Sequence, residues 1–426
     1  MIVTAVSACP PWPNPGMASV DLALHALFRR HRLPAELRFT RLYTPAERNP
    51  DITGPRRERL ERRQELPFQY GPLRGHLGEE LAGGALIYWG DFFHSRDYLR
   101  QCAGTLLEMG AAADEAGALR EVYRCFFLSE APEEALSRAL AFGGTLIFNR
   151  ARDYQDPGYA RALERFVRGA RGVWMRDVYS ALRVARIRSG EGGSLSLGPL
   201  GVDASLLLRD EDLELLPRSD RAEEPADATA GVFFGRAADA RRLGRFARDL
   251  CRELGVKGEW LPWFDSSMRP NHLEATRAGF PALRAGEEEE PPRVGDLLAR
   301  LTRYAFVITD TYHVCLNAWR SGVPAVCVGE ALPNPAGYDV STGWLGAWRD
   351  KRHVFYAMHD AMELYLFREE LADRTAYANR LLYTSHLLGE TAVVRAIAAD
   401  VRERSDAAER ELVAALRGLL GAGGAG

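Results

Sequence analysis

The chain alternates short continuous apolar runs, which favour buried strands, with longer runs whose apolar positions recur at helical spacing. The first run, residues 2–6, leads through a proline-rich turn into an amphipathic stretch at residues 19–31. Further runs predict strands at residues 85–89, 145–148 and 172–175. Helical spacing around residues 159–168 separates the last two, so this half of the chain predicts successive β–α–β units.

A polar stretch at residues 209–230, rich in Asp, Glu and Pro, shows no periodicity, and we interpret it as an interdomain linker. Alternation resumes beyond it, with predicted strands at residues 231–235, 259–262, 304–309 and 324–328. The spacing also predicts helices over residues 241–254 and 310–320, and Gly322 ends the second. Such alternation predicts parallel sheets covered by helices.

We therefore expect an α/β protein of two Rossmann-like domains that face each other across a cleft. Residues 1–208 would form the N-terminal domain and residues 231–390 the C-terminal domain. Residues 391–426 would form a C-terminal helix with a flexible, glycine-rich tail. The length of 426 residues fits this division, because one hydrophobic core seldom organises so long a chain.

The composition, 46% hydrophobic and 27% charged residues, is that of a globular protein and excludes the disordered and fibrous classes. A net charge of -3 provides no general attraction for nucleic acid or acidic lipid, so we expect no nucleic-acid partner. No apolar run reaches the ~18 residues that a membrane span needs, which predicts a cytoplasmic protein without a transmembrane segment. Only Lys257 and Lys351 are lysines, an arginine bias typical of a GC-rich bacterial genome.

The six cysteines form no Cys-x-x-Cys pair and no short metal-ligand spacing, so we expect reduced thiols, no metal and no cofactor. The sequence also lacks the signatures of P-loop NTPases, dinucleotide-binding enzymes, zinc peptidases and α/β-hydrolases. Ligands of open α/β sheets bind beyond the carboxyl ends of the strands, so the turns after predicted strands hold the candidates. These turns contain Asn14 with Gly16, Gly90 to His94, Arg176 with Asp177, Gly235 with Arg236, and Asp310 to His313.

The last turn is the richest in polar groups. If Asp310 or Thr311 caps the following helix, His313 lies in its first turn, where N–H groups and the helix dipole attract anions. Beside a bound phosphate or carboxylate, His313 would act as a general acid. The alternative is a histidine that only packs in the turn.

The other turns carry acid–base and anion-binding candidates. Arg176 has a planar guanidinium suited to bidentate contact with a carboxylate or phosphate, although a local pair with Asp177 would also explain it. Gly90 permits close backbone approach. Asp91 or His94 would accept a proton from an acceptor hydroxyl, unless Asp91 only caps a helix. For two further candidates a surface role is favoured, namely Arg236 and His272.

Four sequence elements, taken in order, resemble the polysaccharide pyruvyl transferase family. They are Ile87-Tyr-Trp-Gly-Asp91, then Val173-Trp-Met-Arg-Asp177 with Ser180, which is similar to the family's Arg-Asp-x-x-Ser element, then Gly201-Val-Asp203, and finally Val307-Ile-Thr-Asp-Thr-Tyr-His313 with Gly322-Val-Pro-Ala-Val326. Together they span most of the chain. The resemblance implies a GT-B-like fold with an N-terminal acceptor-side and a C-terminal donor-side domain.

Members of this family transfer the pyruvyl unit of phosphoenolpyruvate to two hydroxyls of a sugar and release phosphate. The resemblance implies that Arg176 holds the phosphoenolpyruvate anion. His313 matches the histidine of the family's Arg-Leu-His motif and would protonate the developing methyl carbon or assist phosphate departure. Asp91 would orient or deprotonate the acceptor. The remaining expected residues are Asp310, Thr311 and Arg236 on the donor side, and Gly90, His94 and Asn14 on the acceptor side.

The chain departs from the family where Thr311 stands in place of an arginine and Tyr312 in place of the leucine. Either Arg236 or the helix N-terminus compensates, or the donor, acceptor or reaction has changed. We expect a pyruvyl transferase-like enzyme that acts on a sugar or glycoconjugate.

Two alternatives stay open. One is a GT-B glycosyltransferase with a nucleotide-sugar donor, in which the same turn holds a diphosphate and His313 or Asp91 is the base. The other is a binding protein without catalysis. The acceptor, the linkage, the pathway and the oligomeric state, a homo-oligomer included, are not determined by the sequence.

Overall fold

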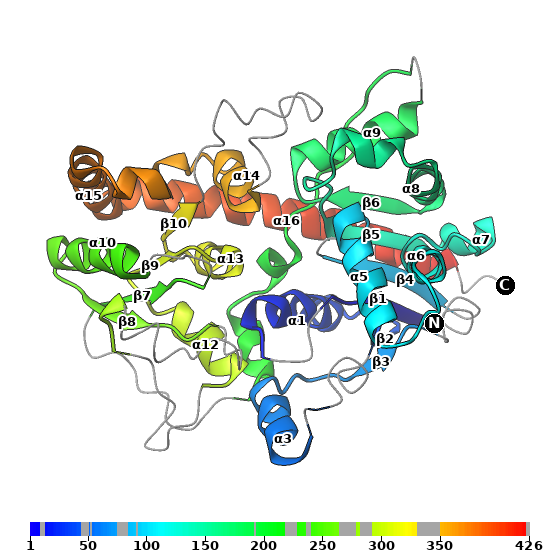
Figure 1. The fold of residues 1–426 in the computed structure, drawn as a ribbon, viewed down its shortest axis with the longest axis horizontal. Coiled ribbons are helices and arrows are strands. Elements are labelled where there is room, and N and C mark those ends of the chain that lie inside the picture. The colour runs from blue at the N-terminus through cyan, green and yellow to red at the C-terminus, as the bar shows by residue number, and fades with distance from the viewer. Residues whose placement is uncertain are drawn as a thin grey trace.

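The computed structural model describes residues 1–8, 13–43, 51, 53–74, 84–90, 93–190, 193–217, 228–235, 240–263, 278–281, 292–329 and 350–422. Two β-sheets with their helices form two domains, at the right and the left of Figure 1, and the C-terminal helix α16 (Thr391–Ala422) runs across both. None of the described helices is both long and apolar enough to cross a membrane.

The first sheet has six parallel strands in the order β3-β2-β1-β4-β5-β6. They are β1 (Ile2–Val6), β2 (Glu36–Arg41), β3 (Tyr70–Pro72), β4 (Gly84–Trp89), β5 (Ala139–Gly144) and β6 (Gly172–Met175). The accompanying helices are α1 (Pro15–Arg30), α3 (Gly54–Arg63), α5 (Arg96–Glu108), α6 (Glu115–Phe127), α7 (Glu133–Leu136), the 3-10 helix η1 (Ala151–Gln155), α8 (Pro157–Gly169) and α9 (Val178–Ser189). The strand order reverses between β1 and β4, which is the switch point of this sheet.

The second sheet has five parallel strands in the order β11-β10-β9-β7-β8. They are β7 (Thr229–Phe233), β8 (Lys257–Trp260), β9 (Phe306–Thr309), β10 (Ala325–Gly329) and β11 (Tyr365–Phe367). The described helices of this part are α10 (Ala240–Glu253), α12 (Val294–Leu301), α13 (Tyr312–Arg320), α14 (Lys351–Met358), η6 (Met362–Leu364), η7 (Arg368–Leu371) and α15 (Arg374–Gly389). Its switch point lies between β7 and β9.

Both sheets are doubly wound, and their strand orders follow the two common patterns of this class, Rossmann-like for the first and flavodoxin-like for the second. The expected α/β class, with two Rossmann-like domains in a GT-B-like arrangement and a C-terminal helix, is confirmed. Strand β4 coincides with an uninterrupted apolar run, and β1 and β9 each add a single buried threonine. Such runs arise because a strand covered by helices on both faces buries side chains on both.

The strand predicted at residues 145–148 is wrong, because β5 lies just before it in the chain. Gly143 has φ of +75°, which glycine adopts without a Cβ penalty, and the pairing with β6 shifts in register between Phe142 and Gly144. The two glycines at the strand end interrupt the apolar pattern that would have marked it. Thr145 instead donates a hydrogen bond to the Asp177 carboxylate at 2.6 Å.

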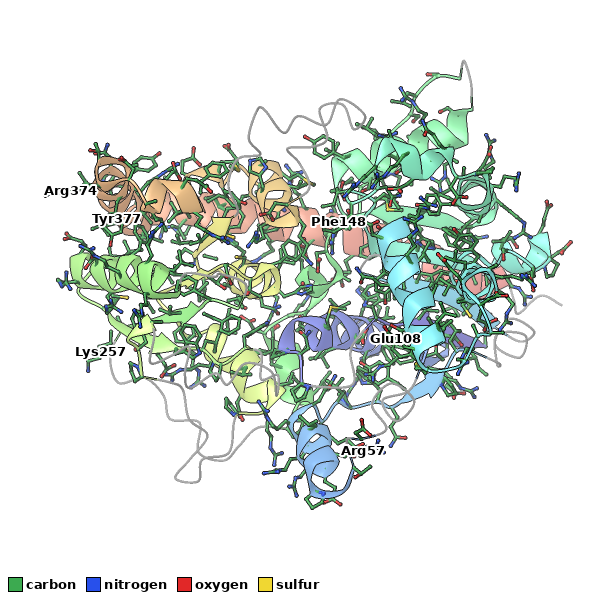
Figure 2. All side chains as sticks on the ribbon, in the orientation of Figure 1. Arg57, Glu108, Phe148, Lys257, Arg374 and Tyr377 are labelled. Atoms are coloured by element: carbon green, nitrogen blue, oxygen red, sulfur yellow. The ribbon has the colours of Figure 1, made fainter. Side chains whose placement is uncertain are left out.

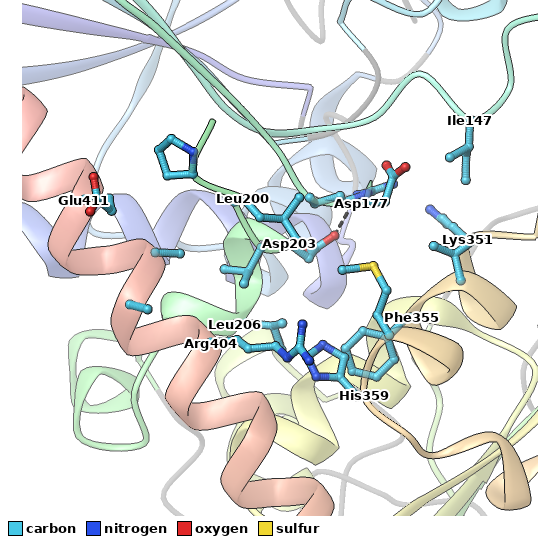
Figure 3. A pocket seen from close by; sticks show the side chains of 18 of the residues that line it. Ile147, Asp177, Leu200, Asp203, Leu206, Lys351, Phe355, His359, Arg404 and Glu411 are labelled. Carbon is cyan, nitrogen blue, oxygen red and sulfur yellow. Dashed lines mark hydrogen bonds and ion pairs between the residues drawn. The ribbon is translucent and has the colours of Figure 1, made fainter. Parts of the chain in front are cut away.

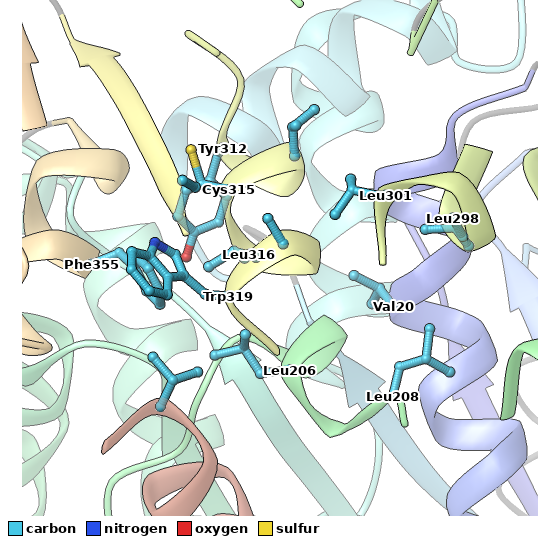
Figure 4. Packing of buried hydrophobic residues seen from close by; sticks show 14 of the residues in the cluster. Val20, Leu206, Leu208, Leu298, Leu301, Tyr312, Cys315, Leu316, Trp319 and Phe355 are labelled. Atoms are coloured by element: carbon cyan, nitrogen blue, oxygen red, sulfur yellow. The ribbon is translucent and has the colours of Figure 1, made fainter. Parts of the chain in front are cut away.

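Residues 204–216, which include the start of the predicted linker, are packed into the molecule. They form the 3-10 helices η2 (Ala204–Leu207) and η3 (Glu211–Leu215), and Leu213 is only 2% exposed. Figure 4 shows Leu206 near Leu316 and Trp319 of α13, and Leu208 near Val20 of α1. One hydrophobic cluster therefore continues from the first domain through η2 into the second.

The two domains also meet directly where α1 and α13 pack together. A Cβ added to Gly16 of α1 would lie 2.5 Å from the Cβ of His313, so the approach requires glycine. The Asn317 amide of α13 donates to the Ser19 hydroxyl of α1 at 3.0 Å. Since α1 follows β1 and α13 follows β9, the carboxyl ends of the two sheets face each other.

Hydrogen bonds and ion pairs of Glu409 in α16 connect the C-terminal helix to the N-terminal domain. Its carboxylate is buried, accepts a hydrogen bond from Arg30 at 3.0 Å, and lies 2.5 Å from Nε2 of His31 and 3.4 Å from Arg209. Burial alone would raise the pKa of Glu409, but the hydrogen bonds from His31 and Arg30 hold that pKa below its ordinary value.

We expect Glu409→Ala to lower the free energy of unfolding by about 1.5–3 kcal/mol, the usual loss for a hydrogen bond to a charged group. Urea denaturation at neutral pH measures this loss. The matched control is Asp406→Ala on the same helix, whose half-exposed carboxylate should change the stability by about 0.5 kcal/mol or less. A carboxylate with a depressed folded pKa stabilises only while ionised, so the difference should vanish as the pH falls through that pKa. Equal effects of the two substitutions would contradict the assignment.

Replacement of Gly16 tests the contact between α1 and α13. Gly16→Ala should cost about 1–3 kcal/mol of stability, because the new methyl group has no room beside His313. Gly104→Ala in α5 is the control, since its Cβ would meet nothing within 4 Å. That change should stabilise the protein by about 0.5–1 kcal/mol through helix propensity. Chemical denaturation compares the two, and a Gly16→Ala protein as stable as the wild type would show that the helices do not approach this closely.

Candidate functional site

At the switch point of the second sheet, Asp310 joins the ends of β7 and β9. Its carboxylate accepts hydrogen bonds from the Gly235 N–H at 2.8 Å and from the Thr311 hydroxyl at 3.0 Å. Arg352 donates to the Asp310 carbonyl at 2.6 Å and pairs with Asp350 at 2.6 Å. Thr311 occupies the N-cap position of α13 without a side-chain capping bond. The expected cap is therefore not observed among the described residues, and the Asp310 carboxylate holds the strand ends together instead.

A buried carboxylate, Asp203, brings two of the predicted residues together. Arg176, at the end of β6, donates to Asp203 at 2.7 Å, and Nε2 of His313 lies 3.9 Å from the same carboxylate. The hydroxyl and N–H of Ser205 also donate to Asp203. Burial alone would raise the pKa of Asp203, but Arg176 and His313 hold that pKa below its ordinary value. Arg176 therefore pairs with Asp203, 27 residues away in the chain, whereas the sequence had indicated only Asp177 as a carboxylate partner.

A cavity of about 380 Å³ opens beside this ion pair, between the two domains and α16 (Figure 3). Its volume is within the range of small-molecule sites. The wall is built from the loop after β5, the turn between β6 and α9, the segment before η2 with η2 itself, α13, α14, the residue after α14 and α16. Its lining residues are Ile147, Arg176, Asp177, Pro199, Leu200, Gly201, Val202, Asp203, Leu206, Tyr312, Lys351, Val354, Phe355, Met358, His359, Arg404, Ala407, Ala408, Arg410 and Glu411.

One end of the cavity, which we call the cationic end, is formed by Arg176, Tyr312 and Lys351. The Lys351 ammonium lies 4.6 Å from the centre of the Tyr312 ring, and the Arg176 guanidinium lies 5.2 Å from the same ring. Helices α13 and α14 begin with Tyr312 and Lys351. Helix N-termini carry partial positive charge, and that of α13, where Thr311 makes no side-chain capping bond, adds to the attraction of this end for anions. The N-terminus of α14 is capped by the Asp350 carboxylate, which accepts from the Arg352 N–H at 2.9 Å.

The predicted acceptor-side residues have packing roles. Asn14 caps α1 by accepting from the Met17 N–H at 3.1 Å. Gly90, with φ of +74°, donates its N–H to a backbone carbonyl at 2.7 Å. His94 stacks on Phe166 in the N-terminal core, and burial lowers its pKa to about 4. None of the three lines the cavity.

Three predicted candidates lie outside the described residues, namely Asp91, Arg236 and His272. Sequence reasoning overlooked the cavity residues on α14 and α16, including Lys351, His359 and Arg404. The one available signal was Lys351, since the chain has only two lysines. The α16 residues follow an ordinary helical pattern with nothing to mark them.

No group of three or more His, Cys, Asp or Glu side chains suited to a metal occurs in the described part of the chain. Cys125, Cys251, Cys315 and Cys327 are buried free thiols, as expected.

No protein-family model and no curated protein matches this sequence. Similar solved structures include the UDP-GlcNAc 2-epimerase of Neisseria meningitidis bound to UDP-GlcNAc, at 8% identity over 98% of this chain and 99% of that one, with a TM-score of 0.48. A spinosyn rhamnosyltransferase complexed with thymidine diphosphate shows 12% identity over 96% of each chain and a TM-score of 0.41. Heptosyltransferase II of E. coli shows 12% identity over 92% of this chain and 99% of that one, with a TM-score of 0.37. The fold assignment rests on the two sheets described above.

Proposed function

We propose that this protein is a transferase that binds a nucleotide sugar in the interdomain cavity and transfers its sugar to an acceptor hydroxyl. The observation that carries the proposal is the cationic end of the cavity, where the charged groups of Lys351 and Arg176 both lie near the ring of Tyr312 and two helices begin. A diphosphate placed there would meet an ammonium group, a guanidinium and helix N-terminal N–H groups. These groups would stabilise the negative charge that grows on the leaving diphosphate.

The length of the cavity favours a donor larger than phosphoenolpyruvate. Lys351 begins α14, and His359 follows the eighth and last residue of this helix. Both line the cavity, and an eight-residue helix is about 12 Å long. A three-carbon phosphoester is too short to reach both ends, whereas a nucleotide sugar carries rings on both sides of its diphosphate. The Phe355 side chain provides apolar surface between the ends.

Pyruvyl transfer from phosphoenolpyruvate is the second candidate. The observation in its favour is that Arg176 and His313, which carry the family resemblance, converge on Asp203. Two features weigh against it. Thr311 supplies no guanidinium, and its hydroxyl donates to Asp310.

A thermal-shift panel separates the two candidates. The protein is incubated with UDP, thymidine diphosphate, GDP or ADP in one series, and with phosphoenolpyruvate in another. We expect at least one nucleoside diphosphate to raise the melting temperature, because a ligand that binds only the folded state stabilises it. Stabilisation by phosphoenolpyruvate alone would replace the first candidate with the second. If no nucleotide changes the melting temperature, the proposal is wrong.

The two lysines allow a matched substitution. Lys351→Met should weaken binding of the stabilising nucleotide about tenfold to a hundredfold, the loss of one hydrogen bond to a charged group. Lys257→Met is the control, since Lys257 lies on β8 at the outer side of the second domain (Figure 2). Calorimetry measures both affinities. An amine-reactive label gives a second readout, because the nucleotide should protect Lys351 and leave Lys257 unprotected. Equal labelling of Lys351 with and without nucleotide would contradict this binding mode.

A further inference from the structure

The end of the cavity opposite Lys351 holds a histidine paired with a carboxylate. His359 follows α14 and is 4% exposed, and its Nδ1 lies 2.6 Å from the Asp400 carboxylate of α16. The side chain lines the cavity, and Figure 3 shows it beside Arg404 and Phe355. None of the sequence patterns pointed to this pair, because its two members are 41 residues apart.

The geometry leaves one ring nitrogen for a ligand. Asp400 holds Nδ1, and the described residues form no hydrogen bond with Nε2 of His359. The Phe355 ring packs against the imidazole with 4.5 Å between ring centroids, which fixes the orientation of the ring. An imidazole whose Nδ1–H is held by a carboxylate presents an unprotonated Nε2, the arrangement of a general base.

The charges around His359 keep the ring neutral until it accepts a proton. Burial lowers the pKa of His359 more than the neighbouring Asp400 raises it, and Arg404 of α16 lowers it further. The remaining ionisable groups that line the cavity are Arg176, Asp177, Asp203, Tyr312, Lys351, Arg410 and Glu411. Once the ring accepts a proton, the Asp400 carboxylate stabilises the imidazolium.

We propose that His359 is the catalytic base of the transfer reaction and that Asp400 is its positioning residue. This inference rests on the proposed function. As the acceptor oxygen forms its bond to the anomeric carbon of the donor, Nε2 of His359 takes the hydroxyl proton. The bond from that carbon to the diphosphate breaks, and the nucleoside diphosphate leaves with the electron pair. The cationic end holds the leaving group, while the dyad lies at the other end of α14.

The first arm of the test needs no donor. Diethyl pyrocarbonate acylates accessible, neutral imidazoles, and mass spectrometry locates the modified residues. His359 and His94 are equally buried, at 4% exposure each, but only His359 lines the cavity. We therefore expect His359 to be acylated through the cavity in the unliganded wild-type protein and His94, stacked on Phe166 in the N-terminal core, to resist. If His359 resists as completely as His94, its ring is not reachable from the cavity and the proposal is overturned. This result is obtained whether or not the protein binds a nucleotide.

The second arm measures turnover, as release of the nucleoside diphosphate from the nucleotide sugar. His359→Gln should lower the rate about 10²–10⁴-fold, the usual contribution of a general base. Its affinity for the nucleoside diphosphate should stay within about twofold, since the ring lies away from the cationic end. His386→Gln, at an exposed histidine of α15, is the matched control and should retain the wild-type rate.

Asp400→Asn separates positioning from simple packing. Asp400 raises the pKa of His359, so its neutralisation should lower that pKa and move the acidic limb of the rate profile to lower pH, with a reduced plateau. A bond that only ties α14 to α16 would change stability and leave the pH profile in place, and that result would overturn the proposal. A His359→Gln rate close to wild type would overturn it as well. Failure of the wild type to bind any nucleotide would remove the proposed function, and the acylation result would then decide on its own whether the dyad faces the cavity.

Discussion

The buried carboxylate of Asp203 holds together the parts of the molecule that form the cavity. It binds Arg176 at the end of β6 and Ser205 in η2, and it faces His313 of α13. An ionised carboxylate without partners at such a position would cost several kcal/mol, so Arg176 and Asp203 depend on each other. Because the three partners come from the first sheet, the segment between the domains and the second domain, this one group fixes their relative positions at the cavity wall.

The same pair shapes the electrostatics of the site. Asp203 neutralises much of the charge of Arg176, so the field at the cationic end owes more to Lys351 and to the helix N-termini than the sequence suggested. Asp310 and Thr311 stabilise the strand ends that position α13. The turn that sequence reasoning selected thus holds strand ends and contributes Tyr312 to the cavity wall, and further lining residues come from α14 and α16.

Three histidines show how environment decides what one residue type can do. His94 stacks inside the N-terminal core, with its Nε2 bonded to a backbone carbonyl and its pKa depressed by burial. His313 packs against Gly16 and faces Asp203 at the domain contact. Nδ1 of His359 contacts the Asp400 carboxylate, and the side chain of His359 lines the cavity. Position in a predicted turn singled out the first two, whereas the third could be recognised only from its surroundings.

The sequence by itself determined the class of fold, because hydrophobic periodicity is a local property of the chain. A few adjacent, mostly apolar residues are enough to predict strands such as Ile2–Val6 and Phe306–Thr309. It also placed Arg176 and His313 in turns that follow predicted strands. It misplaced β5, because two glycines interrupted the apolar run. The linker predicted at residues 209–230 begins within the packed segment 204–216. Only the tertiary structure decided the composition of the cavity. Pairs such as Arg176 with Asp203 and His359 with Asp400 join residues far apart in the chain, and no local pattern records which helix faces will meet across a domain boundary.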